Sequence, residues 1–154
     1  MGFSSNHGQV LLALESLLRS MDLDDLTDEE VRIRNNWLQN GQPKRGISII
    51  DEGEKYSDGT VGTQDIGYLC GIVFVDGATY DDPMDNDRIK SWVETIRRRL
   101  TDQRLNVTIA GATDPAEHVM VVERSGEHLT NPAKYPNYKI RRTVVAVWLR
   151  ENNP

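Results

Sequence analysis

The sequence predicts an α+β fold, in which a single mixed or antiparallel β-sheet is packed by one main amphipathic helix and by N-terminal helices. Two long apolar runs, 65–77 and 140–151, have the nearly continuous hydrophobic character of strands that are covered on both faces. Between them, residues 86–103 follow the period of an amphipathic helix. Helices and strands are segregated along the chain, which favours this class over alternating βαβ units.

The bulk properties indicate one globular domain over residues 1–154, with an N-terminal helical part at 1–40 and an α+β core at 46–151. No apolar run approaches the roughly 20 residues of a membrane helix, and the N-terminus lacks the pattern of a secretory signal. We therefore expect no membrane partner. The single cysteine, Cys70, cannot form an internal disulfide, which fits synthesis in a reducing compartment.

Charge is distributed unevenly. The net charge of −6 argues against a protein that grips duplex DNA, because such affinity comes from Lys and Arg that neutralise phosphates. Residues 51–87 carry ten acids against one base, whereas residues 88–104 carry six bases against two acids. This zoning favours charge-complementary contacts within one chain or between copies, and solvated charged faces are the alternative.

Two helices are expected at the N-terminus. The first covers 8–21, capped by Ser5 or Asn6, because its apolar residues form a helical stripe. Thr27 and Glu30 have the spacing of a capping box and predict the start of a second helix. Gly41 and Pro43, both within 40–46, are expected to end it.

The middle of the chain reads as strand, loop and strand. Residues 47–50 predict a short strand, and 51–64 (DEGEKYSDGTVGTQ) predict a long polar loop. Loops of this length in compact domains are often functional or ordered by a partner. The strand at 65–77 contains Gly67 and Gly71, which leave space for a close approach by another part of the protein.

The helix at 86–103 and the last strands complete the core. Its apolar face consists of Ile89, Trp92, Val93, Ile96 and Leu100. Asp85 or Asn86 is the expected N-cap, and the three arginines Arg97, Arg98 and Arg99 near its end suit the helix dipole. Further strands are expected at 106–111, 118–126 and 140–151, with an irregular Pro-containing segment at 127–139.

Candidate chemistry is sparse. The carboxylates Asp81, Asp82, Asp85 and Asp87 could hold a divalent metal or act as an acid/base pair, but their spacing fails the EF-hand pattern. A turn at Pro83 followed by a helix cap explains them better. His7, His118 and His128 lack local zinc-pair spacing and are expected at the surface, although His118 and His128 could approach each other across a hairpin. We assign no catalytic, metal-binding or cofactor-binding residue and expect no cofactor.

The order of elements resembles the small tail-terminator (tail-completion) proteins of tailed bacteriophages. The resemblance lies in an N-terminal helix, a strand of the type GISIIDEGE, a flexible loop, the run DIGYLCGIVFVDG, a helix like NDRIKSWVETIRRRL and a closing strand like YKIRRTVVAVWLRE. It extends from about Gly8 to Glu151. The N-terminal helical pair is longer than the family pattern, which leaves another neck or head–tail joining protein as the alternative.

The resemblance implies a structural virion protein of the tail or neck, assembled in the host cytoplasm. Its expected partners are copies of itself in a hexameric ring, the tail tube protein and the head–tail connector, while DNA passes through without specific binding. We expect lumen or oligomer contacts from Glu52, Glu54, Lys55, Tyr56 and Asp58, and partner contacts from Arg97, Arg98, Arg99 and Tyr135. Two rivals remain: a small metal-dependent hydrolase that uses Asp81, Asp82, Asp85 and Asp87, and a monomeric regulatory adaptor.

Overall fold

The structure is a computed structural model. It describes residues 3–21, 23, 26–34, 45–58, 62–76, 83–100, 119–128 and 139–152, with the backbone alone at 58, 83–86, 119–128, 139–140 and 152. Within these ranges the elements are α1 (Asn6–Ser20), the 3₁₀ turn η1 (Asp28–Glu30), β1 (Val31–Ile33), β2 (Arg45–Asp58), β3 (Thr63–Asp76), α2 (Pro83–Leu100), β4 (Val119–His128) and β5 (Lys139–Asn152).

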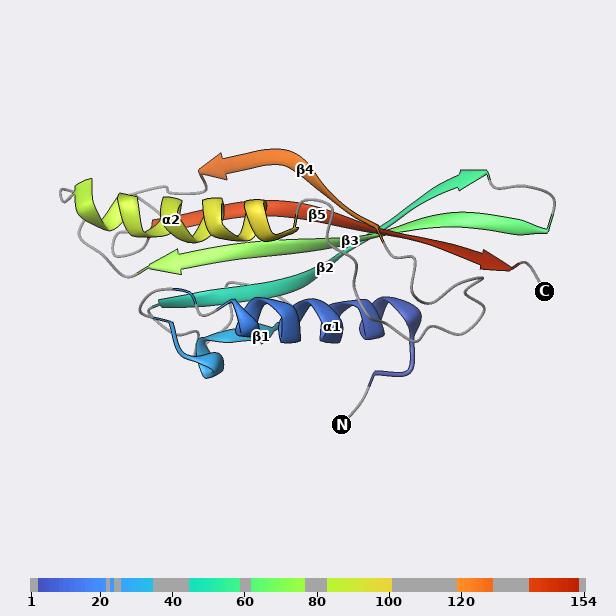
Figure 1. The fold of residues 1–154 in the computed structure, drawn as a ribbon, viewed down its shortest axis with the longest axis horizontal. Helices are drawn as coiled ribbons and strands as arrows, with labels where there is room; N and C mark the ends of the chain where they lie inside the picture. Colours follow the sequence, from blue (N-terminus) through green and yellow to red (C-terminus); the bar gives the residue numbers. More distant parts are fainter. Residues whose placement is uncertain are drawn as a thin grey trace.

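One mixed sheet organises the molecule. The described strands lie in the order β1-β2-β3-β5-β4, and Figure 1 shows the sheet's strong twist. β1 runs parallel to β2, and every other neighbouring pair is antiparallel. With α1 and α2 packed on this sheet, the predicted α+β class is confirmed.

Both helices cover the same face of the sheet. Alternate residues of β3, from Ile66 to Phe74, join one buried cluster that also contains residues of α1 and of α2. The opposite face is apolar as well, because Val73 and Ala146 are fully buried without belonging to that cluster. The prediction that the runs in β3 and β5 are covered on both faces is therefore correct.

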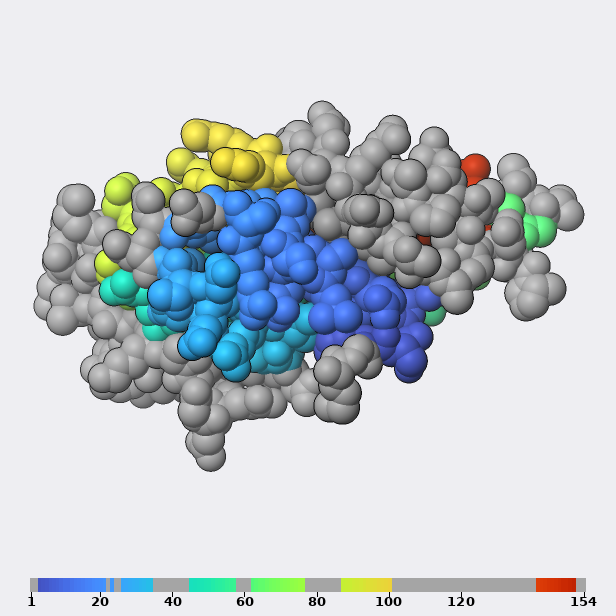
Figure 2. All heavy atoms as spheres, turned by 60° about the horizontal axis from the view of Figure 1, so that its bottom comes forward, coloured from blue at the N-terminus to red at the C-terminus, as the bar shows by residue number. Residues whose placement is uncertain are grey.

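Helix α1 forms as its stripe predicts. The Ser5 Oγ accepts a hydrogen bond from the Gly8 N–H at 3.0 Å, which confirms Ser5 as the N-cap. The helix starts at Asn6, two residues before the predicted start. Its buried side chains are His7, Val10, Leu11, Leu14 and Leu18, with Gly8 at the first turn. Figure 2 shows this N-terminal part of the chain on the face of the molecule that is turned forward there.

The predicted second helix is wrong beyond its first turn. The capping box exists, since the Thr27 N–H donates to Glu30 Oε1 at 3.0 Å, but it caps only the short η1. The chain then enters β1, where Val31 pairs with Ile47 of β2. Val31 is β-branched and buried, and its pairing with an existing strand outweighs the local helix signal. Residues 35–44, including Gly41 and Pro43, lie outside the described ranges.

The edge strand β1 is held by side chains of α1. The Ile33 N–H donates to Glu15 Oε2 at 2.9 Å, and Arg19 Nε donates to the Val31 carbonyl at 3.0 Å. These bonds satisfy backbone groups that an edge strand would otherwise present to another chain. The helix therefore contributes to the sheet through both its apolar stripe and its polar flank.

The predicted polar loop at 51–64 is instead most of a β-hairpin. β2 continues to Asp58 and β3 begins at Thr63, with a register shift between Asp51 and Glu54. Glu52 and Gly53 both face Leu69 at this β-bulge, and Gly53 has the positive φ of 92° that favours glycine. This part of β2 could not be recognised in the sequence because its exposed side chains show no apolar alternation. It forms a strand because its backbone pairs with β3.

Helix α2 starts earlier than predicted. Pro83 is its first residue, so the N-cap precedes Asp85 and Asn86, consistent with the preference of proline for the first helical position. The apolar face predicted for this helix is buried, apart from the half-buried Val93. Next to the helix, Arg88 Nε donates to the buried carboxylate of Asp76 at 2.8 Å, which ties α2 to the end of β3.

The C-terminal strands follow the prediction. β4 covers the expected 118–126 region and β5 covers 140–151, each within two residues of the predicted bounds. The predicted strand at 106–111 and most of the irregular segment at 127–139 lie outside the described residues.

Gly67 provides a test of close packing in the sheet. A Cβ at this position would lie 2.9 Å from Cε2 and Cζ2 of Trp148, its cross-strand partner. We expect Gly67→Ala to lower the free energy of unfolding by about 1–3 kcal/mol through overpacking, measured by urea denaturation. The cost should shrink in a Trp148→Leu background, whereas Ser57→Ala, at an exposed site, should change stability by less than about 0.5 kcal/mol. Equal costs of Gly67→Ala in both backgrounds would contradict this packing.

Candidate functional site

The part of the sheet beyond the bulge forms a three-stranded projection. We call it the hairpin arm: residues 54–58 of β2, 63–68 of β3 and 147–152 of β5. Figure 1 shows it running past the N-terminal end of α1. Arg150 binds Asp65 across the arm, where its Nε donates to Oδ1 at 2.9 Å and its Nη2 donates to Oδ2 at 3.3 Å. This hydrogen bond lowers the pKa of the Asp65 carboxyl below its usual value.

The arm has open backbone edges among the described residues. β1 pairs with β2 only at residues 47–49, so in the described ranges no strand borders the outer side of β2 beyond them. On the other side, β4 reaches β5 only as far as Trp148. Two large hydrophobic side chains in the described part of the chain are exposed. Tyr56 of the arm is the more exposed of them, at 65%.

The residues predicted to make lumen or oligomer contacts divide into two groups. Lys55 and Tyr56 are exposed on the arm, and Asp58 is the last residue of β2. Glu52 instead lies over Gly71 on the face away from the helices, where Arg142 binds it through two bonds of 3.0 and 2.8 Å. Glu54 contacts α1. These two carboxylates are therefore occupied within the chain.

The residues predicted to contact a partner are not gathered with the arm. Arg97, Arg98 and Arg99 are exposed on the last turn of α2, and Arg98 forms an ion pair with Glu94 at 3.8 Å. Tyr135 lies outside the described residues. The structure thus separates the arm residues of β2 from the arginines of α2.

The acidic cluster is described only in part. Asp81 and Asp82 lie outside the described residues, Asp85 belongs to the first turn of α2, and Asp87 is exposed on that helix. Among the side chains that the structure does describe, no group of three His, Cys, Asp or Glu residues is arranged to hold a metal ion.

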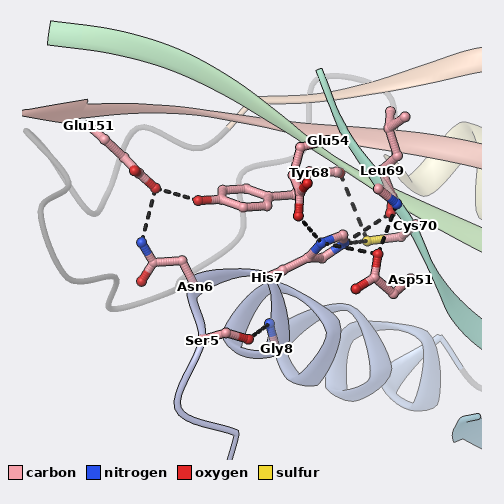
Figure 3. Close-up of polar contacts among 11 residues, drawn as sticks. Ser5, Asn6, His7, Gly8, Asp51, Glu54, Tyr68, Leu69, Cys70 and Glu151 are labelled. Atoms are coloured by element: carbon pink, nitrogen blue, oxygen red, sulfur yellow. Dashed lines mark hydrogen bonds and ion pairs between the residues drawn. The ribbon is translucent and has the colours of Figure 1, made fainter. Parts of the chain in front are cut away.

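His7 is the functional candidate that sequence reasoning missed. It was expected at the surface, but it is only 5% exposed. Its side chain extends from the first turn of α1 to the base of the arm (Figure 3). Its Nδ1 is 3.2 Å from Glu54 Oε1 and 3.3 Å from Asp51 Oδ1, and its Nε2 is 3.0 Å from the Leu69 carbonyl oxygen. We call these three residues and that carbonyl the bulge cluster.

The bulge positions the carboxylates of this cluster. Asp51 Oδ1 accepts a hydrogen bond from the Gly53 N–H at 2.8 Å, which fixes the chain where it leaves the regular ladder. The one extra residue of the bulge brings Glu54 onto the helix side, as its contact with His7 shows. Two carboxylates thus converge on one imidazole nitrogen.

A second polar group joins α1 to the end of β5. The Asn6 side chain donates to Glu151 Oε1 at 3.0 Å, and the Tyr68 hydroxyl donates to the same oxygen. Burial and then the hydrogen bond to Glu151 raise the pKa of the Tyr68 hydroxyl, so it stays protonated as a donor. The first turn of α1 therefore contacts all three strands of the arm.

No family model matches this chain, and a comparison with the curated proteins finds no match either. No helix among the described residues is long and apolar enough to cross a membrane.

Cys70 lies close enough to His7 to suggest a Cys–His–carboxylate arrangement. The Sγ is 4.0 Å from His7 Nε2, while the other ring nitrogen faces Asp51 and Glu54. Burial raises the pKa of this thiol to about 12, and its exposure is 0%. The His7 Nε2, which would have to take the thiol proton, is already hydrogen-bonded to the Leu69 carbonyl. The arrangement therefore lacks the reactive thiolate of a nucleophilic site.

The sequence did contain a signal for His7. The residue falls on the apolar stripe of α1 with Val10, Leu11, Leu14 and Leu18, at helical intervals of three, four, seven and eleven. A polar side chain on a stripe that faces the core must find buried partners. What the sequence hid is the identity of those partners, because they lie on a segment that was predicted to be a loop.

The Cys70 thiol is expected to resist labelling while the protein is folded. A pKa of about 12 in place of 9.0 lowers the thiolate fraction at pH 8 by about a thousandfold, and burial slows the reaction further. A chromogenic disulfide reagent should therefore react with the native protein at least a thousandfold more slowly than with the chain in guanidinium chloride. The unfolded chain, which has one cysteine, is the control. Rapid labelling of the native protein would contradict the inert thiol.

Proposed function

We propose that this chain is a structural virion protein of a tailed bacteriophage, which forms an oligomeric ring that terminates the tail tube and joins it to the head connector. The observation that carries the proposal is the hairpin arm, which no further strand borders on either outer side among the described residues. The order of helix, long hairpin, helix and closing strands also agrees with the resemblance found in the sequence. Another head–tail joining protein, built as a ring by the same contacts, is the alternative.

The open edges favour assembly of copies in a ring. Unpaired edges present backbone donors and acceptors, and natural proteins cover or pair such edges. The outer edge of β2 and the outer edge of the β5 end differ from each other, so contact between them is head to tail. Repeated head-to-tail contacts close into a ring when the rotation permits, and otherwise form a filament. The exposed Tyr56 supplies an aromatic anchor of the kind enriched at interfaces.

The charge pattern suits a channel through which DNA slides. The net charge is −6, and Asp51, the exposed carboxylate at the base of the arm, retains 58% side-chain exposure. A lumen lined with acids repels phosphates, whereas one lined with Lys and Arg would hold them. In this proposal the arm faces the lumen or the neighbouring subunit, and the arginines at the end of α2 face the tube or connector protein.

The oligomeric state of the full chain tests the proposal. At high protein concentration we expect particles with a mass that is a multiple of 17.4 kDa in light scattering, and rings in negative-stain images. Tyr56→Ser should raise the concentration needed for assembly about tenfold or more, because loss of an interface anchor weakens the binding free energy by over about 1.4 kcal/mol.

The matched control is Phe3→Ser, which removes the other exposed large hydrophobic side chain, 44% exposed and beside Gly8 of α1. It should leave assembly unchanged, and circular dichroism should show that Tyr56→Ser melts like the wild type. A wild-type chain that stays monomeric up to its solubility limit would overturn the ring proposal. Assembly that both variants weaken equally would place the interface elsewhere.

A further inference from the structure

We propose that the first turn of α1 braces the hairpin arm, so that the strand carrying Tyr56 is held in one position before any partner binds. Asn6 and His7 are the positioning residues of this brace. The ordering of the arm is a property of the single chain. Its use, as a preformed contact surface for a second copy of the chain, rests on the proposed function.

The outer half of β2 needs such a support. Residues 54–57 are exposed, so burial of apolar side chains does not hold this segment against the core. Its backbone pairs with β3 on one side, and none of the described strands borders its other side beyond residue 49. A segment with few buried apolar contacts and an exposed edge lies at the low end of local stability. Contacts with α1 therefore decide how firmly this half of β2 is held.

Two adjacent residues of α1 reach opposite sides of the arm (Figure 3). The Nδ1 of His7 lies 3.2 Å from Glu54 Oε1 of β2, and the Asn6 side chain donates to the carboxylate of β5 at 3.0 Å. Tyr68 of β3 lies between them. Its hydroxyl donates to Glu151, and its ring centroid is 5.2 Å from that of His7. The contacts therefore run across all three strands of the arm without a break.

The brace is anchored in the core. Ser5 caps the first turn of α1, and the helix buries four apolar side chains in the core cluster: Val10, Leu11, Leu14 and Leu18. His7 and Tyr68 are only 5% and 6% exposed. Polar contacts that are sheltered from water in this way are stronger than those of exposed groups. Movement of the arm away from the helix must break them.

Glu54 connects the brace to Tyr56. Residues two apart in a strand share one face of the sheet. Glu54 pairs with Tyr68, and Tyr56 pairs with Ile66, the next residue on the same face of β3. Asp51, the other carboxylate near His7 Nδ1, precedes the bulge, so Glu54 is the contact that reaches the arm itself. Holding Glu54 against α1 thus fixes the course of the strand from which the exposed Tyr56 ring projects.

Native-state hydrogen exchange of the single chain, at constant pH, tests the brace with two variants. Asn6→Ala removes the donor to Glu151 and suits a helix, whereas Glu54→Thr removes the contact with His7 and suits a strand. In each variant we expect the amides of the arm to exchange about tenfold faster or more, the effect of losing one hydrogen bond to a carboxylate. Arm amides that exchange at the wild-type rate in both variants would overturn the brace.

The matched controls place the same new residues at exposed positions outside the brace: Ser16→Ala on α1 and Ser57→Thr on the arm. Both should keep the wild-type exchange of the arm amides. Urea unfolding of the same variants measures global stability. A loss of global stability in Asn6→Ala or Glu54→Thr without faster arm exchange would also count against the brace, because the arm would then open without breaking the contact.

Assembly measures the positioning role. A loosened arm must be ordered when two copies meet, so Glu54→Thr should raise the concentration needed for assembly about threefold or more, although Tyr56 is still present. Faster arm exchange with unchanged assembly would overturn the positioning role. A wild-type chain that stays monomeric would refute the ring alone, since hydrogen exchange in the single chain still decides the brace.

Discussion

The pairing of β3 with both of its neighbours is the constraint on which the rest of the molecule depends. β3 is the middle strand of the five described strands, bonded along its length to β2 and to β5. Its residues on one face pack against both helices, and Val73 on the other face is also buried. Because the side-chain period of a strand is two, a slip of one residue in either pairing would exchange these faces. Apolar character on both sides thus allows β3 to be central, and pairing fixes which side receives the helices.

The bulge in β2 converts this regular pairing into a site. Two residues opposite Leu69 interrupt the ladder, and the carboxylates on either side of the interruption meet a histidine of α1. On the other face, the same segment sends Glu52 over Gly71 to Arg142. One short irregularity therefore ties β2 to α1 on one face and to β5 on the other. In the arm beyond it, residues 54–57 of β2 are exposed, whereas four residues of the other two strands are buried in the core cluster: Ile66, Tyr68, Val147 and Leu149.

Nucleophilic chemistry at this site is excluded by burial rather than by a lack of suitable residue types. A thiol, an imidazole and two carboxylates lie together, yet the thiol is sealed in the core with a raised pKa. The exposed features of the described chain are instead strand edges, two aromatic rings and charged side chains. Such features suit the proposed assembly role, in which the buried cluster would position the base of the arm.

The sequence by itself determined the elements whose stability is encoded locally or by strong periodicity. The stripes of α1 and α2, the Ser5 cap and the doubly covered runs of β3 and β5 were predictable because each buries a pattern with its own period. Only the tertiary structure decided β1, the outer half of β2 and the environment of His7. Val31 leaves the helical path because a strand edge is available to it, and residues 54–58 become a strand because β3 supplies the hydrogen bonds. His7 is buried because that strand brings carboxylates to it, and partners supplied from so far along the chain leave no trace in the local sequence.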